Sequence, residues 1–101
     1  IVLRHYIFVI VSFADKKSEK VWIGEYSKEL SLEVQNQARK KLRMINNAIN
    51  LDDLKIPPGN KLESLKGDRK GQFSIRINDQ WRICFMWKEN NAHLVEIVDY
   101  H

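Results

Sequence analysis

The last third of the chain alternates between apolar and polar residues with a period of two. Residues 73–77 show this alternation first, and residues 81–87 repeat it after a short polar interval. Such a period is typical of half-buried β-strands. A third strand is expected from about residue 93 to residue 100, after the turn-forming run at 89–91. The pattern therefore predicts an antiparallel three-stranded meander.

Two segments before the meander have helical character. Apolar residues recur every three or four positions from Ser31 to about Asn50, which predicts one long helix with a buried face. The residues of this face are Leu30, Val34, Ala38, Leu42, Ile45 and Ile49. Residues 16–25 follow Asp15, a favoured N-cap residue, and predict a short surface helix that ends at Gly24.

An apolar segment, Tyr6 to Phe13, precedes both helices. It is rich in β-forming residues on both faces, which predicts a strand buried in the centre of a sheet. Residues 1–10 begin with Ile rather than Met and are expected to be an extension. The order of strand, two helices and meander predicts one α+β domain over residues 1–101, with the helices packed on one face of the sheet.

Length and composition narrow the classes of protein. The chain has 101 residues, 44% of them apolar, and its longest uncharged apolar run is far shorter than the roughly 20 residues of a membrane span. A membrane protein is therefore not expected. The single cysteine, Cys84, allows no internal disulfide, which favours a reducing cytoplasm and a role in the core. The three histidines do not share a metal-binding spacing, so neither a metal nor another cofactor is expected.

The positive charge is concentrated in the middle of the chain. Residues 39–82 hold 11 Lys and Arg against 5 Asp and Glu, whereas the remaining residues hold 6 against 8. Such a distribution favours a polyanion, and nucleic acid above all, as the partner. The candidate phosphate contacts are Arg39, Lys40 and Arg43 in the helix, and Arg69 and Lys70 in the loop at 66–71. These residues could equally form a solvated face.

The register of the first two meander strands places two arginines together. The apolar sets coincide only if Ile77 faces Trp81, and Arg76 then lies opposite Arg82. Two guanidinium groups in this position repel one another unless an anion lies between them. The sequence therefore predicts a phosphate site on the sheet face away from the helices.

The end of the chain is expected to join this site. A two-residue turn at Asn90-Asn91 would pair Arg82 with Asp99, and His101 would emerge on the same face. Lys66 and Arg69 lie in the loop that leads into the first of these strands. The alternative interpretation is an ordinary cross-strand ion pair between Arg82 and Asp99, with a frayed terminus.

Several motifs together resemble the HigB toxins of the RelE superfamily over about residues 11–101. They are Pro57-Pro58-Gly59-Asn60, the run from Leu65 to Arg69, the run from Ser74 to Ile83, and the closing Asp99-Tyr100-His101. The resemblance implies a RelE-like compact domain and a type II toxin that cleaves mRNA in the ribosomal A site without a metal ion. It also implies a HigA-like antitoxin with a helix-turn-helix domain, through which alone the toxin would reach operator DNA.

The resemblance carries over to particular residues. Lys66, Asp99, Tyr100 and His101 match the active-site residues of the family, and Arg82 matches the arginine beside the scissile phosphate. Arg76 is a weaker match, and some members have a histidine where Glu63 stands. The expected roles are proton transfer by His101, orientation by Asp99, contact with the cut nucleotide by Tyr100, and charge stabilisation by Lys66, Arg82 and Arg76.

Two other functions are compatible with the basic domain. A ParE-like toxin of the same fold would poison DNA gyrase by binding and would not cut RNA. A basic RNA-binding module would bind ribosomes and leave mRNA intact. The closing Asp99-Tyr100-His101 favours the ribonuclease, because neither alternative requires these residues at the terminus.

Overall fold

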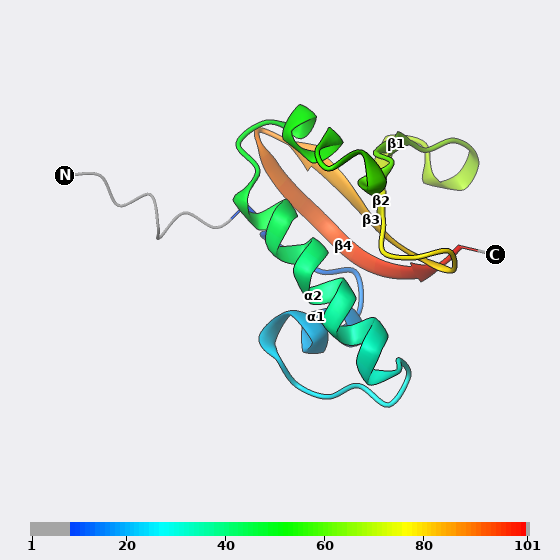
Figure 1. Ribbon diagram of the computed structural model, residues 1–101. Helices are drawn as coiled ribbons and strands as arrows, with labels where there is room; N and C mark the ends of the chain where they lie inside the picture. Colours follow the sequence, from blue (N-terminus) through cyan, green and yellow to red (C-terminus); the bar gives the residue numbers. More distant parts are fainter. Residues whose placement is uncertain (1–8, 101) are drawn as a thin grey trace.

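A computed structural model of the protein describes residues 9–100. The helices α1 (Lys16–Ile23) and α2 (Leu32–Asn47) come first, and a four-stranded antiparallel sheet in the order β1-β2-β3-β4 completes the fold (Figure 1). The strands are β1 (Glu63–Ser64), β2 (Gln72–Arg76), β3 (Trp81–Lys88) and β4 (Asn91–Asp99). Short 3₁₀ turns lie at Leu51–Lys55, Pro58–Asn60 and Gly67–Arg69. The predicted α+β class is confirmed.

The core lies between the helices and one face of the sheet. Fully buried residues of α2 meet fully buried residues of the strands, and each large apolar side chain in such a position contributes about 1.5–3 kcal/mol. The principal members are Ala38, Leu42, Ile45, Ile75, Ile83, Phe85 and Ile97. The helices pack on one face of the sheet, as the helical and the strand patterns of apolar residues predicted.

Side-chain caps set where the helices begin. Asp15 accepts a hydrogen bond from the backbone N–H of Ser18 at the start of α1, and Ser31 does the same for Val34 at the start of α2. Gly24 ends α1 in the left-handed region with φ of 86°. In the described part of the chain, no helix has the length and apolar character to cross a membrane.

The long helix ends earlier than predicted. It stops at Asn47, and the backbone N–H groups of Ile49 and Asn50 instead donate to Asp53 Oδ2 at 2.9 and 3.1 Å. These bonds start the next 3₁₀ turn, and they leave Ile49 55% exposed. The assignment of Ile49 to the buried face was therefore wrong.

The apolar N-terminal segment lies at an edge of the sheet. Residues 9–13 run parallel to β4 through isolated bridges from Ile10 to Ala92 and from Phe13 to Val95. Ile10 is buried, but Val11 is 48% exposed. A central strand was therefore wrong for this part, because β2, β3 and β4 follow one another directly in the sheet, β1 pairs with the outer edge of β2, and the outer edge of β4 is the one that residues 9–13 join. The remainder of the predicted strand, and most of the predicted extension at 1–10, lie outside the described residues.

The strand β1 was not anticipated from the sequence. It pairs Glu63 with Ser74 and Ser64 with Phe73 at the edge of the sheet opposite the N-terminal segment. Leu62 and Leu65 flank it and are partly or fully buried, as the sequence suggested for this connection. Because β1 has only two residues, its apolar and polar positions give no periodic signal.

One hydroxyl group joins α1 to the edge of β4. The Ser18 side chain is fully buried, and its Oγ accepts a hydrogen bond of 2.8 Å from the backbone N–H of Ile97. Ile97 is itself fully buried. The bond therefore satisfies a backbone donor that lies away from water.

Replacing Ser18 with Ala should lower the free energy of unfolding by about 1–3 kcal/mol, because the Ile97 N–H would be left without its acceptor. Urea denaturation with an unchanged m-value would measure the loss. Ser64→Ala, at an exposed position on β1, should change stability by less than about 0.5 kcal/mol. Equal stability of the two variants would contradict the assigned role of the hydroxyl.

Candidate active site

The turn between β2 and β3 is closed by the side chain of Asn78. Its Oδ1 accepts hydrogen bonds of 2.8 Å from the backbone N–H groups of Gln80 and Trp81. Its Nδ2 donates to Gln37 Oε1 on α2 at 3.2 Å. The register is the predicted one, and Arg76 lies directly opposite Arg82.

The register between β3 and β4 differs from the prediction. The turn uses Glu89 and Asn90, with φ of 54° and 62°, so Lys88 pairs with Asn91. Two positive φ values are typical of the tight turns that match the twist of a hairpin. The predicted turn at Asn90-Asn91 was one residue too late.

A bulge in β4 shifts the pairing again. Met86 pairs with His93, and Cys84 then pairs with Glu96, so one residue more is present on β4 than on β3. Leu94 adopts φ of 52° within this bulge. After it, Arg82 pairs with Val98, and Asp99 pairs with Trp81. The predicted pairing of Arg82 with Asp99 was therefore wrong, and so was the alternative of an ordinary cross-strand ion pair; Asp99 shares the face of Trp81 and not that of Arg82.

The Arg82 guanidinium is buried against the β1 side of the sheet and is only 6% exposed. Its Nε donates to Ser74 Oγ at 2.8 Å, and its Nη2 donates to the carbonyl oxygens of Lys61 at 2.5 Å and Ser74 at 3.3 Å. Glu63 Oε1 lies 3.5 Å from Nη2, on a side chain that is half exposed. Arg82 is thus rigidly held, mainly by neutral oxygen atoms.

Tyr100 covers this guanidinium. The centroid of its ring lies 5.2 Å from Arg82 Cζ, a cation–π distance, while 47% of the residue remains exposed. The Tyr100 backbone N–H donates to the Gln80 carbonyl at 2.8 Å, and Gln80 Nε2 donates to Asp99 Oδ2 at 3.1 Å. The turn that sets the β2–β3 register therefore also holds the end of β4. The predicted role of His101 concerns a residue outside the described part of the chain.

Arg76 is more accessible than Arg82. A third of its side chain is exposed, and its Nη2 lies 2.5 Å from Oδ1 of Asp79 in the turn, a carboxylate that is almost fully exposed. Lys66 lies at the start of the 3₁₀ turn Gly67–Arg69 and is exposed. Arg76 and Lys66 can both reach solvent, where a phosphate group would approach.

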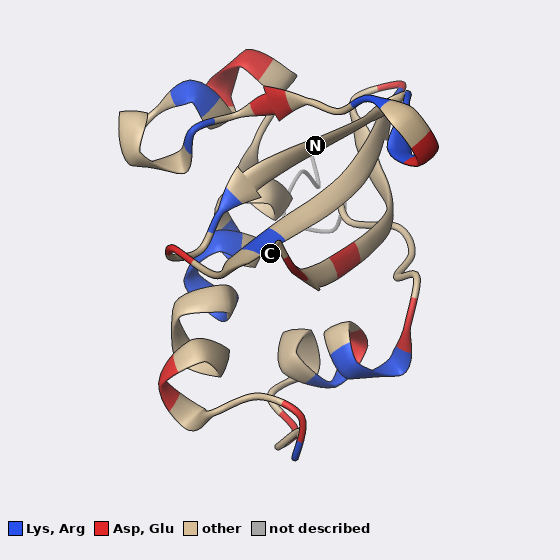
Figure 2. Cartoon of the chain, turned by 90° about the vertical axis from the view of Figure 1, so that its right-hand side faces the viewer, with Lys and Arg blue, Asp and Glu red and all other residues tan. Residues whose placement is uncertain are grey.

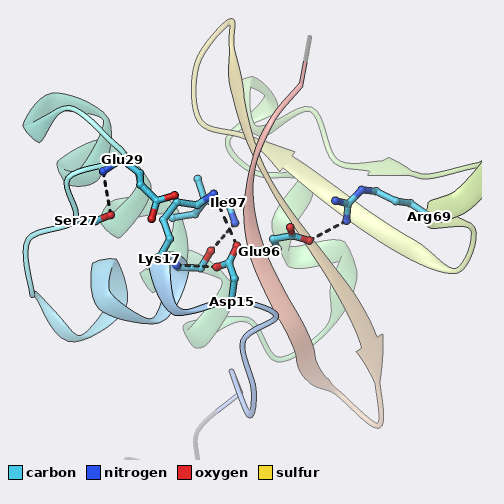
Figure 3. Close-up of polar contacts among 8 residues, drawn as sticks. Asp15, Lys17, Ser27, Glu29, Arg69, Glu96 and Ile97 are labelled. Carbon is cyan, nitrogen blue, oxygen red and sulfur yellow. Dashed lines mark hydrogen bonds and ion pairs between the residues drawn. The ribbon is translucent and has the colours of Figure 1, made fainter.

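Arg69, in the loop before β2, is engaged by side chains of the sheet, Glu96 and Gln72. Its Nη1 lies 3.2 Å from Glu96 Oε1 and donates to Gln72 Oε1 at 3.0 Å, and Figure 3 shows the Arg69 and Glu96 side chains turned toward each other. Burial raises the pKa of the neighbouring Cys84 thiol, and the positive charge of Arg69 offsets only part of this effect. Cys84 is therefore an unreactive core residue, as predicted. Lys70 is exposed.

The basic residues of α2 divide into two groups. Arg39 Nε donates to the Val21 carbonyl at the end of α1 at 2.9 Å, so this side chain joins the two helices. Lys40 and Arg43 are exposed. Lys41 turns toward the 3₁₀ turn Pro58–Asn60 and donates to Asn60 Oδ1 at 2.5 Å.

Figure 2 shows that basic segments of α2, of the end of β2 and of the start of β3 gather beside the end of β4. Sequence reasoning missed three neighbours of this cluster: Glu63, Ser74 and Lys41. Ser74 could have been found, because it lies two positions before Arg76 and so shares its face. Among the described residues, no group of three or more His, Cys, Asp and Glu side chains could hold a metal ion.

The family model of HigB-like toxins, described as RelE-like toxins of the type II toxin-antitoxin system HigB, matches residues 11–101. The chain belongs to this family. It is 36% identical to Toxin HigB-1 of Vibrio cholerae over 83 residues, which are 81% of this chain and 87% of that protein. It is 44% identical to Endoribonuclease HigB of Proteus vulgaris over 41 residues, 41% of this chain and 45% of that protein.

A solved structure shows the same fold at low sequence identity. The YoeB-YefM complex from Staphylococcus aureus matches this HigB-like toxin with a TM-score of 0.60 and 17% identity, covering 91% of this chain and 97% of the other. The predicted RelE-like architecture is thereby confirmed.

Replacing Arg82 with Met in this HigB-like toxin should lower the free energy of unfolding by about 2–4 kcal/mol, because oxygen atoms of Ser74 and Lys61 would lose their donors. Arg76→Met removes a partly exposed ion pair and should cost less than about 1 kcal/mol. Chemical denaturation of both variants would measure the difference. Equal losses would show that the hydrogen bonds of Arg82 do not hold β1 against β2.

Proposed function

We propose that this HigB-like toxin inhibits translation by cleaving mRNA in the ribosomal A site, with the 2′-hydroxyl of the RNA as nucleophile. The observation that carries the proposal is the cross-strand pair of arginines, Arg76 and Arg82, with the Tyr100 ring against the guanidinium group of the second. Two arginines at facing positions of one ladder, together with a half-exposed aromatic ring, fit the phosphate backbone and a base of an RNA strand. The relative from Proteus vulgaris is named an endoribonuclease, which supports the same reaction class.

The reaction needs a base for the 2′-hydroxyl, positive charge near the pentacoordinate phosphorus, and an acid for the leaving 5′-oxygen. Arg82 supplies charge that is already fixed in place, because neutral oxygen atoms accept its shorter hydrogen bonds and the half-exposed carboxylate of Glu63 lies farther away, at 3.5 Å. Arg76 and the exposed Lys66 supply contacts that form as the strand enters. Charge that is positioned in advance requires no reorganisation in the transition state.

Proton transfer falls to the end of the chain. His101 has an imidazole whose ordinary pKa lies near neutrality, so it can exchange a proton at the pH of the cell. Asp99 would orient it, and Tyr100 would stack on or donate a hydrogen bond to the cut nucleotide. This route uses side chains and the hydroxyl of the RNA alone, and it requires no cofactor.

The open geometry of the site supports dependence on the ribosome. In-line attack requires a bent RNA strand, and a few side chains on an open sheet face align a flexible strand poorly. The exposed cations Lys40, Arg43 and Lys70 would hold the toxin on ribosomal RNA. Arg39 and Arg69 would contribute less, since both are engaged within the protein.

The proposed regulatory partner is a HigA-like antitoxin with a helix-turn-helix domain. A relative of the same fold was solved in a YoeB-YefM toxin-antitoxin complex, with 18% identity and a TM-score of 0.50, which supports a protein antitoxin. Operator DNA would then be contacted through the antitoxin, and the toxin itself would act on ribosomes in the cytoplasm.

Replacing His101 with Gln should abolish growth arrest and A-site cleavage, because glutamine cannot transfer a proton at neutral pH. Primer extension on mRNA from induced cells would map the cleavage sites. The variant should keep the wild-type thermal unfolding midpoint and its binding to the antitoxin, which separates a chemical defect from a folding defect.

The same measurement separates the competing functions. Intact mRNA together with DNA-damage signalling on induction of the wild type would indicate a gyrase poison. Intact mRNA on toxin-bound ribosomes would indicate an RNA-binding module. Undiminished cleavage by His101→Gln would remove this imidazole from the mechanism.

A further inference from the structure

The motif Pro57-Pro58-Gly59-Asn60 places a buried amide beside the basic cluster. Asn60 is fully buried, and its Nδ2 donates to the carbonyl oxygens of Leu54 at 3.2 Å and Ile56 at 3.4 Å. With its amino group fixed in this way, Oδ1 faces α2 and accepts a hydrogen bond of 2.5 Å from Lys41 Nζ. The amide therefore fixes where the ammonium group of Lys41 lies.

Lys41 is held there without a counter-charge. In the described part of the chain, no carboxylate lies within ion-pairing distance of its Nζ, and its hydrogen-bond acceptor is a neutral amide. Partial burial lowers the pKa of Lys41, and the positive charge of Arg76 lowers it further. Asn60 is followed by Lys61, whose carbonyl oxygen accepts a hydrogen bond from Arg82, and Arg82 lies across the ladder from Arg76, so this turn brings the Lys41 ammonium group toward the two arginines. An anion that reached these cations would be stabilised by their charges.

We propose that Lys41 and Arg76 form a second phosphate-binding site, which holds the RNA phosphate next to the one that is cut. Because Arg76 lies directly across the ladder from Arg82, one strand of RNA could place neighbouring phosphates on the two sites. The identity of this anion as RNA rests on the proposed function, whereas the existence of an anion site does not.

Arg76 already forms an ion pair, with Asp79. Its carboxylate lies against the Arg76 guanidinium, and its side chain is 98% exposed. An incoming phosphate would take the place of this carboxylate on Arg76. The proposal therefore assigns opposite effects to two side chains: Lys41 strengthens phosphate binding, and Asp79 weakens it.

Titration of the full-length toxin with inorganic phosphate, followed by NMR, tests the site without ribosomes. Wild type should show saturable shifts at Lys41, Asn60 and Arg76. Lys41→Gln keeps a donor for Asn60 but removes the charge, and it should weaken phosphate binding about tenfold. Asp79→Asn should bind phosphate more tightly than wild type. Lys41→Arg should keep most of the wild-type phosphate affinity that Lys41→Gln loses. Lys88→Gln, at the opposite end of β3, removes an equal charge and should leave binding unchanged.

Ribosome assays then test whether the anion is RNA. With purified programmed ribosomes, Lys41→Gln should raise the half-saturating concentration about tenfold and leave the rate at saturation within about twofold. The salt dependence of binding should become shallower, by a log–log slope of about 0.7 for one lost phosphate contact. Lys88→Gln should match wild type in both quantities.

The outcomes separate the two proposals. If Lys41→Gln binds phosphate as wild type does, with an unchanged unfolding midpoint, Lys41 only supports Asn60 and the second site is overturned. If the variant loses phosphate but cleaves mRNA on ribosomes with wild-type half-saturation, the site does not hold RNA and this inference fails. If wild type itself cuts no mRNA, the proposed function fails, and the phosphate titration still decides the anion site.

Discussion

The side chain of Asn78 holds the pairing of β2 with β3 through two backbone donors of the turn, and it also attaches this turn to Gln37 of α2. A slip of one residue in this pairing would turn every side chain of β3 to the other face. Ile83 would then leave the core, and Arg82 would enter it beneath the helices. The hydrogen bonds of Asn78 therefore fix the pairing that buries the apolar face of β3. The same pairing places Arg76 and Arg82 on the opposite face.

Burial of Arg82 would be costly for a charge without partners, yet its partners leave most of that charge in place. A close, fully buried carboxylate would satisfy and neutralise the guanidinium together. Here the carbonyl oxygen of Lys61 and both oxygens of Ser74 satisfy it, and Glu63 is half exposed at the longer distance of 3.5 Å. Most of the hydrogen bonds of Arg82 are therefore accepted by neutral oxygen atoms, and its one carboxylate partner is more distant and half exposed, which leaves a rigid cation that is only partly neutralised.

The sequence determined the β2–β3 register but not that of β3 with β4, for a physical reason. Between β2 and β3 only one pairing brings the two apolar sets together, so hydrophobicity alone selects it. Between β3 and β4 the outcome depends on Leu94, whose positive φ is costly for a residue with a side chain. Burial of Val95 and the hydrogen bond from the Leu94 N–H to Ser12 Oγ offset that cost. Neither contact is local, so no pattern along the chain predicts the bulge. Arg82 shows the same limit of sequence patterns. Its face was predicted correctly, but its burial beside β1 depends on residues distant in the sequence and was not predicted.

The turn before β1 shows how one short motif acts on two elements at once. Asn60 holds the ammonium group of Lys41 on α2, and the carbonyl of the next residue, Lys61, accepts from Arg82 on β3. Lys61 adopts φ of 46°, so consecutive residues turn their acceptors toward different partners. Because the two acceptors belong to adjacent residues, the cations they hold cannot move apart without distorting this turn. The motif therefore couples the helix to the sheet and sets the spacing between these two cations.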